Sequence, residues 1–314
     1  MKRRTLLHAG VAALSAAAAS MPMAQERTKV RLGYTAVADF YPVFVAAEQG
    51  YFSKSGLDVE FVLLPLTANV PPGLESDSIQ IGGVSPSVFI SAIDGGLDHV
   101  ALAGATIGGR NSTELGLVAR AGSGIHTAQD CVGKKIGVAG IGSALHVSFR
   151  AWLIYNKVDW RKVVFVEAAF PQQPDLLRGG TVDAVVSAEP FMSRIVDSGV
   201  GYIASYYTTA LEDDQQKMVY EATRAWTQKN PGAVKAFRQS LAEASAFAQV
   251  PANDPAVRAA IGKYIKLPPP VLAKIKLAPP QPVLTAKALE SWVVMMQVQD
   301  MLKSKIDAKR LLVP

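Results

Sequence analysis

Two serines stand at turns where a predicted strand gives way to a predicted helix, and this placement points to the binding of an anion. Ser85 follows the apolar run at 79–84, and Ser143 follows the apolar run at 135–139. A helix N-terminus presents unpaired backbone N–H groups and the positive end of the helix dipole. A serine adds a hydroxyl donor there, so two such turns facing one cleft would suit a carboxylate, a sulfonate or a phosphate. The alternative is that each serine only caps its helix.

Three further kinds of side chain could complete such a site. Phe40 and Tyr41 stand in the turn after the first predicted strand, where they would either wall an apolar pocket or plug the top of the sheet. Arg110, between the two halves of the chain, could hold an anion through two hydrogen bonds or be a solvated hinge residue. Asp39 and Glu189 could receive an ammonium group or a ligand hydroxyl, or act as negative caps of their own helices.

Other chemistries lack the residues that they need. The stretch GGVSPS has the first glycine of a hydrolase G-x-S-x-G turn, but Ser87 stands where the second glycine belongs. The single cysteine, Cys131, excludes an internal disulfide, and no H-E-x-x-H spacing occurs, so we expect no metal site. His146 is expected to be packed or solvated on a helix. In IGVAGIGSALH, Leu145 replaces the third glycine of a dinucleotide fingerprint, and we expect neither a cofactor nor an enzyme.

The serine turns belong to a pattern that occurs twice in the chain. Residues 30–64 read as strand, turn, helix and strand, and residues 134–168 repeat this order, with about 28 residues between strand starts in both copies. Each copy continues with another strand and a Pro-containing turn, at 78–96 and at 181–199. Strands that alternate with helices predict βαβ units and parallel sheet. Two copies therefore mean two similar α/β lobes, or one sheet with an internal duplication.

Two connecting segments favour separate lobes. Residues 99–120 are apolar, then glycine-rich, then apolar again, as expected for a strand that crosses a hinge. Residues 201–223 again read as strand, loop and strand, which would insert the second lobe into the first. We therefore expect lobe 1 at 25–109 and 207–314, and lobe 2 at 110–206. Ligands bind beyond the carboxyl ends of parallel strands, so the ligand cleft should lie between the lobes.

The first 24 residues predict a secretory signal peptide. Lys2, Arg3 and Arg4 precede an apolar, alanine-rich stretch at 6–19, and small residues follow for cleavage. A Sec signal is favoured, although the paired arginines also allow a twin-arginine reading. Removing this segment, which has three basic and no acidic residues, lowers the formal charge from +6 to +3. Because no dense basic run remains, we expect that the protein does not bind nucleic acid. The signal peptide predicts a periplasmic location, and we expect a monomer.

Four motifs, taken in order, resemble a known protein family. They are YPVFVAAEQGYFSKSGLDVEFV, IQIGGVSPSVFISAIDGG, CVGKKIGVAGIGSALH and FPQQPDLLRGGTVDAVVSAEPF. Their order and spacing resemble the periplasmic solute-binding proteins of ABC importers, in the nitrate/sulfonate/taurine group. The resemblance implies a type II periplasmic-binding-protein fold, in which two α/β lobes with mostly parallel sheets are joined by a two-strand hinge. It also implies hinge closure around a small-molecule ligand, and delivery to a membrane permease that works with a cytoplasmic ATPase.

The resemblance also implies which residues meet the ligand. The matching positions are Phe40, Tyr41, Ser85, Pro86, Gly142, Ser143, Ala144 and Glu189. Arg110 and Asp39 join them through position and chemistry alone. We expect a small organic anion such as a sulfonate or taurine, with an aromatic carboxylate as the alternative. Nitrate is less favoured, because aromatic walls suit so small an ion poorly. An exported enzyme or a ligand-sensing receptor module on the same fold are the alternatives of another class.

Overall fold

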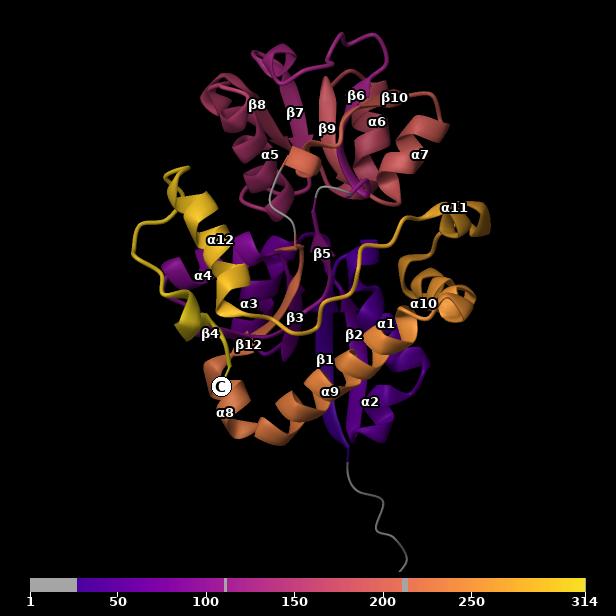
Figure 1. Ribbon diagram of the computed structural model, residues 1–314, viewed down its shortest axis with the longest axis vertical. Coiled ribbons are helices and arrows are strands. Elements are labelled where there is room, and N and C mark those ends of the chain that lie inside the picture. Colours follow the sequence, from indigo (N-terminus) through magenta and orange to yellow (C-terminus); the bar gives the residue numbers. More distant parts are fainter. Residues whose placement is uncertain (1–26, 110–111, 211–213, 314) are drawn as a thin grey trace, which may run out of the picture.

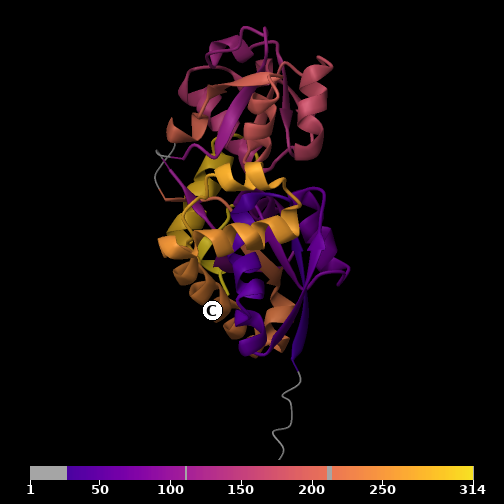
Figure 2. The same ribbon diagram turned by 90° about the vertical axis from the view of Figure 1, so that its right-hand side faces the viewer.

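The computed structural model describes residues 27–109, 112–210 and 214–313, so the predicted signal peptide and Arg110 lie outside the described residues. Two α/β lobes are stacked along the longest axis of the molecule, and each has its own sheet (Figure 1). The view turned by 90° separates them in the same way (Figure 2). The sequence left open a single duplicated sheet or two lobes, and the structure has two lobes.

The sheet of lobe 1 has five strands, and one of them runs against the others. In spatial order they are β2 (Leu57–Leu63), β1 (Thr28–Tyr34), β3 (Ile81–Val84), β12 (Val219–Thr223) and β4 (His99–Gly104). β1 pairs in parallel with both neighbours, with Leu32 opposite Phe61 on one side and Ile81 on the other. β12 is antiparallel to β3 and to β4, so all the strands except β12 share one direction.

Lobe 2 repeats this arrangement. Its strands, in spatial order, are β8 (Val164–Glu167), β7 (Lys135–Val138), β9 (Ala184–Ala188), β6 (Leu115–Arg120) and β10 (Gly201–Ser205). β7 pairs in parallel with β8 and β9, whereas β6 is antiparallel to β9 and β10. In each lobe, the reversed strand is the one that the chain forms directly after crossing from the other lobe. The internal repeat in the sequence is therefore a repeat of topology.

Helices cover the sheets of both lobes (Figure 1). In lobe 1 these are α1 (Tyr41–Glu48), α2 (Tyr51–Lys54), α3 (Val70–Glu75), α4 (Pro86–Asp94), α8 (Arg224–Lys229), α9 (Pro231–Ala248), α10 (Asp254–Ile265), α11 (Pro269–Lys274) and α12 (Ala286–Gln297). In lobe 2 they are α5 (Ala144–Tyr155), α6 (Gln173–Arg178) and α7 (Phe191–Asp197). Within the described ranges, no helix has both the length and the apolar character that a membrane span requires.

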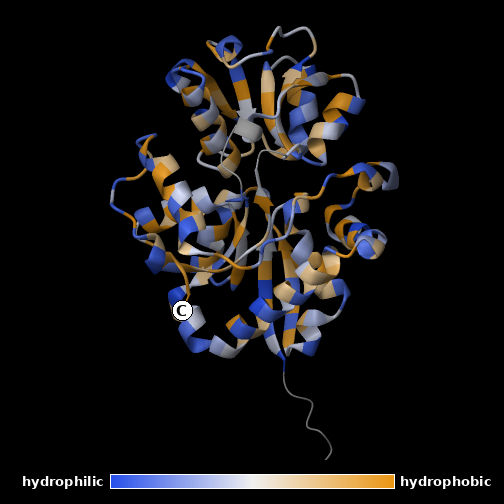
Figure 3. Cartoon of the chain, viewed as in Figure 1, coloured by the Kyte–Doolittle hydropathy of each residue, from blue (hydrophilic) through white to orange (hydrophobic). Residues whose placement is uncertain are grey.

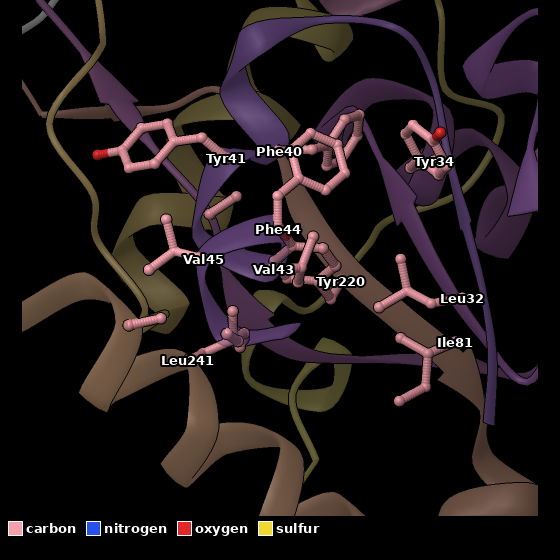
Figure 4. Packing of buried hydrophobic residues seen from close by; sticks show 14 of the residues in the cluster. Leu32, Tyr34, Phe40, Tyr41, Val43, Phe44, Val45, Ile81, Tyr220 and Leu241 are labelled. Atoms are coloured by element: carbon pink, nitrogen blue, oxygen red, sulfur yellow. The ribbon is translucent and has the colours of Figure 1, made fainter. Parts of the chain in front are cut away.

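The strands β3, β4, β6 and β9 are buried along nearly their whole length, as strands covered by helices on both faces require. Hydrophobic residues are concentrated in the strands of both sheets (Figure 3). In lobe 1, Phe40 lies fully buried beside Tyr220 of β12, with the ring centroids 6.1 Å apart (Figure 4). A side chain at Gly83 in β3 would collide with the Phe40 ring. The glycine is therefore needed to let this ring pack flat on the sheet.

The hinge consists of two short strands and a buried ion cluster. β5 (Ile107–Gly108) and β11 (Gln215–Gln216) form an antiparallel pair between the lobes. Lys217 follows β11, and its Nζ lies 2.9 Å from Asp39 Oδ1 of lobe 1 and 3.0 Å from Glu114 Oε1 at the entrance to β6. Burial opposes the charge of Lys217, but the two carboxylates outweigh this effect and raise its pKa. The cluster ties the hinge to both lobes.

The lobes also touch along α5. Val147 of this lobe 2 helix belongs to the same apolar cluster as Phe89 of α4 and Trp292 of α12. Beyond α12, Gln299 Nε2 donates a hydrogen bond of 3.0 Å to the Val147 carbonyl. Arg150 Nη2 donates in return to the Gln299 carbonyl, also at 3.0 Å. The first turns of α5 are therefore held against lobe 1.

Candidate functional site

A small cavity lies between the lobes, where strands of both sheets end. Its described lining residues are Thr35, Pro65, Leu66, Thr67 and Ser85 from lobe 1, Ala139, Ser143, Ala144, Leu145 and Phe170 from lobe 2, and Met218 beside the hinge. This is the location that the carboxyl ends of parallel strands predict. None of these described residues carries a charge, so hydroxyl and backbone N–H groups supply the hydrogen-bond donors.

The two serines that the sequence singled out face this cavity from opposite lobes. Ser85 is the N-cap residue of α4 and Ser143 is the N-cap residue of α5, both with extended backbone. In the described structure, neither side chain caps its own helix. Ser143 Oγ is buried without a hydrogen-bond partner among the described residues, and Ser85 Oγ lies 3.3 Å from Ser87 Oγ. The Ser143 hydroxyl therefore remains available to a ligand, as do the N–H groups in the first turns of both helices. Ser87 Oγ donates its only proton to the Gly142 carbonyl, so Ser85 donates to Ser87 and must turn its proton away to meet a ligand.

Local sequence explains why these turns are shaped in this way. Pro86 occupies the first position of α4, where its fixed φ suits a helix and its missing N–H costs nothing. A proline also drives the preceding residue to extended backbone, which is the conformation of Ser85. In lobe 2, Gly142 has φ of +82°, a conformation that side chains rarely adopt. It allows the chain to turn sharply before Ser143.

Thr35 and Thr67 also bring hydroxyls to the cavity, and Thr35 is buried there. It directly follows β1, is 4% exposed, and its Oγ1 has no hydrogen-bond partner among the described residues. The rest of the lining is largely apolar and includes Leu66, Leu145 and Met218. Buried polar groups are normally paired, so the hydroxyls of Thr35 and Ser143 can donate to a ligand in this cavity. The site can receive a head group with hydrogen-bond acceptors and an apolar remainder.

The predicted aromatic wall lies elsewhere. Phe40 is packed in the core of lobe 1, and Tyr41 is buried with its hydroxyl donating to the Ala278 carbonyl at 3.1 Å. Burial, followed by the nearby Asp39 carboxylate, raises the pKa of Tyr41. Neither ring is among the described lining residues of the cavity. The aromatic ring that does line it is Phe170, which stacks on Phe191 with centroids 5.5 Å apart.

The two candidate carboxylates already have partners. Asp39 accepts hydrogen bonds from Lys217 and, at 2.8 Å, from Thr106 Oγ1. Glu189 Oε1 accepts from Ser193 Oγ at 2.7 Å, and its Oε2 accepts from the Ser193 backbone N–H at 3.3 Å. Burial raises the pKa of Glu189, and the bonds from Ser193 oppose this effect. Glu189 therefore lies one residue before the N-cap of α7, Pro190, and its carboxylate accepts from an N–H of the first turn, which is the capping role that the sequence offered as the alternative.

The remaining predicted residues divide into three cases. Ala144 lines the cavity, beside Ser143. Gly142 and Pro86 shape the two serine turns, and the Gly142 carbonyl accepts a hydrogen bond of 2.8 Å from Ser87 Oγ across the lobes. Arg110 lies outside the described residues. The sequence interpretation missed Thr35 and Thr67, although both follow strands and could have been found by the rule that located the serines.

Comparison with known proteins supplies the family. The model of the NMT1-like family matches residues 23–262. The chain belongs to this family. It is 26% identical over 249 residues to the nitrate/nitrite binding protein NrtA of Nostoc sp., covering 74% of the chain and 56% of NrtA. The chain thus spans about half the length of the curated relatives that it matches.

Solved structures share the fold. The periplasmic aliphatic sulphonate binding protein SsuA from Escherichia coli superposes with a TM-score of 0.73 at 19% identity, covering 90% of the chain and 97% of SsuA. The desulfurization enzyme DSZB superposes with a TM-score of 0.63 at 16% identity, covering 92% and 97%. The two-lobed fold and the family resemblance predicted from the motifs are confirmed. The fold by itself serves both binding proteins and an enzyme.

Proposed function

We propose that the protein is the extracytoplasmic substrate-binding component of an ABC importer and that it captures a small anion between its lobes. The observation that carries this proposal is the pair of N-cap serines, Ser85 and Ser143, which meet at one cavity from opposite lobes without capping their helices. An anion placed there would receive hydroxyl and helix N-terminal donors from both lobes at once. Binding would therefore favour the closed arrangement.

The ligand class that we propose is a small organic monoanion with a sulfonate or similar head group. The three hydroxyls of Thr35, Ser85 and Ser143 suit a head group with several acceptor oxygens. The apolar wall formed by Leu66, Phe170 and other residues suits a short carbon chain rather than a bare ion. Nitrate is the competing ligand, because NrtA of Nostoc sp. is named a nitrate/nitrite binding protein. An aromatic carboxylate stacked against Phe170 is the third candidate.

The proposed mechanism is closure of the two lobes around the ligand, and the proposed partner is a membrane permease. The ligand would bind first to one lobe, and closure about the β5–β11 hinge would add donors from the other lobe and exclude water. A membrane permease with a cytoplasmic ATPase would then receive the ligand from the closed form. Relatives include a protein named as a nitrate import ATP-binding protein and one named as a bicarbonate transport ATP-binding protein, which supports this assignment. We propose a monomer in the periplasm, which releases its ligand chemically unchanged.

A thermal-shift panel on refolded, ligand-free protein tests the function. It would include taurine, methanesulfonate and longer alkanesulfonates, nitrate, benzoate, and neutral controls. A ligand at about 100 times its dissociation constant stabilises the folded state by roughly 2.7 kcal/mol, which is readily seen. A shift with one anion class supports the proposal and names the head group. Shifts with neutral solutes alone would overturn the anion assignment, and recovery of a chemically altered ligand would overturn the transport assignment.

Substitution of the serines tests the site. Ser85→Ala combined with Ser143→Ala should raise the Kd for the selected anion at least tenfold, because two donors to a charged group are lost. The matched control is Ser91→Ala, an exposed serine of the same helix α4, which should leave the Kd unchanged. Isothermal titration measures both. An unchanged Kd in the double variant would remove the serines from the site.

A further inference from the structure

His146 stands beside the proposed ligand contact Ser143 and bonds to its turn. It is the third residue of α5, and its Nδ1 accepts a hydrogen bond of 2.9 Å from the Gly142 backbone N–H. In a capping box, the N-cap hydroxyl bonds to the third residue of the helix, whose side chain reaches back to the N-cap N–H. Here the side chain of the third residue, His146, reaches the N–H of Gly142, one position before the N-cap residue Ser143. The Ser143 hydroxyl makes no bond within the described structure.

The hydrogen bond from Gly142 fixes the protonation state of the ring. An N–H donor requires Nδ1 to be an acceptor, so the imidazole is neutral and carries its proton on Nε2. The ring is 3% exposed and packs edge-on against Phe165 of β8, with centroids 4.5 Å apart. Burial, followed by the charge of Arg150 one turn along α5, lowers the pKa of His146 to about 4.

The other charged group at this turn is Glu167, at the end of β8. Its Oε1 accepts a hydrogen bond of 3.0 Å from the Ile141 backbone N–H, so the carboxylate is directed to the turn. Protonation of His146 would set a new N–H donor against the Gly142 N–H, and the bond would be lost. The turn keeps its shape only while the imidazole is neutral.

The same glycine is held from the other lobe. Its carbonyl accepts from Ser87 Oγ of α4 at 2.8 Å, and Ser87 Oγ lies 3.3 Å from Ser85 Oγ in the cavity. The peptide groups of Gly142 therefore connect His146 in lobe 2 to Ser87 and Ser85 in lobe 1. Any rotation of this turn would move Ser143 and break the contact between the lobes.

We propose that His146 is a positioning residue, whose neutral Nδ1 holds the Gly142–Ser143 turn so that the Ser143 hydroxyl stays free for the ligand and the Gly142 carbonyl meets Ser87 on closure. The effect of His146 on the shape of the turn does not depend on the ligand. The role toward the ligand rests on the proposed function. The test therefore has one arm without ligand and one arm with it.

The ligand-free arm uses nitrogen-15 NMR of the whole protein. At pH 7, well above its lowered pKa of about 4, we expect His146 to be in the neutral Nε2–H form and the Gly142 amide to exchange slowly. His146→Phe keeps a ring against Phe165 but removes the acceptor, and should speed Gly142 exchange about tenfold, a typical effect of one lost hydrogen bond. His146→Asn places Oδ1 where Nδ1 was, and should restore slow exchange. An Nδ1–H tautomer in the wild type, or unchanged exchange in His146→Phe, would overturn the proposal.

The ligand arm measures Kd for nitrate and for methanesulfonate at pH 7. For the probe that binds the wild type, His146→Phe should raise the Kd about tenfold, because loss of the bond to Gly142 lets the turn move and misdirects the Ser143 hydroxyl. His146→Asn keeps an acceptor for the Gly142 N–H, so its Kd should stay near that of the wild type. Equal Kd values in all three proteins would refute the role toward the ligand. If neither probe binds the wild type, the choice of anion fails, whereas the NMR arm still decides whether His146 positions the turn. The tautomer of His146 is measured in the wild-type protein, so this test does not depend on whether a variant folds.

Discussion

Replacing the buried hinge lysine should destabilise the protein strongly. Lys217→Met removes a cation whose side chain is 7% exposed and leaves the carboxylates of Asp39 and Glu114, 8% and 10% exposed, without a counter-charge. Contacts of 2.9 and 3.0 Å each contribute roughly 6 kcal/mol at an effective dielectric constant of about 20. The loss of hydration of the buried charges offsets much of this attraction. Breaking such buried clusters typically costs about 3–5 kcal/mol of unfolding free energy.

Urea unfolding at pH 7, followed by far-ultraviolet circular dichroism, measures this loss. The matched control is Lys276→Met, an exposed lysine bonded to Thr113, which should change the unfolding free energy by less than about 0.5 kcal/mol. Adding Asp39→Asn and Glu114→Gln to Lys217→Met should recover much of the stability, because no unpaired charge then remains buried. A cost below about 1 kcal/mol for Lys217→Met alone would refute the argument that the cluster depends on its cation.

Three further predictions concern protonation and packing. Burial opposes the charge of His99, but contacts of 3.0 Å and 2.9 Å to two carboxylates raise its pKa. The stabilisation from protonated His99 is complete below the pKa of about 6.5 that histidine has in the unfolded chain, and it is lost as the pH rises through the higher pKa of His99 in the folded protein. The free energy of unfolding should therefore decline above about pH 6.5 in the wild type, and it should decline less in His99→Gln. Burial raises the pKa of Cys131 to about 12, so a thiol reagent at pH 8 should modify it only in urea. Gly83→Ala should cost about 1–3 kcal/mol in the same urea assay, because the added methyl collides with Phe40.

The turns that carry the site could be predicted because their signals are local. A strand, a small polar residue and a helix start follow one another at both Ser85 and Ser143, and the repeat of this order implied two facing lobes. The paired topology of the two sheets is the physical form of that repeat. Cleft residues found in this way depend only on the direction of parallel strands.

The positions of Phe40, Tyr41 and Asp39 could not be predicted, because their partners lie far along the chain. Phe40 is buried by Tyr220, Tyr41 bonds to the Ala278 carbonyl, and Asp39 bonds to Lys217. Each partner belongs to the segment that returns from lobe 2 or follows it. A turn residue that looks exposed in its own sequence context is thus covered by a later part of the chain. His146 is packed on a helix, one of the two outcomes expected from the sequence. Its hydrogen bond could not be predicted, because the partner is a backbone N–H that no sequence pattern reports.

The strand order has a consequence for the sequence of events during folding. All strands of lobe 2 lie within residues 115–205, so a nascent chain that reaches this point has every strand of that sheet. The sheet of lobe 1 is different, because β12 (Val219–Thr223) inserts between β3 and β4, which are made more than 100 residues earlier. Until β12 arrives, lobe 1 consists of two separated pieces with exposed apolar edges. Lobe 2 can therefore form as a unit first, and the domain that begins the chain is the last to close.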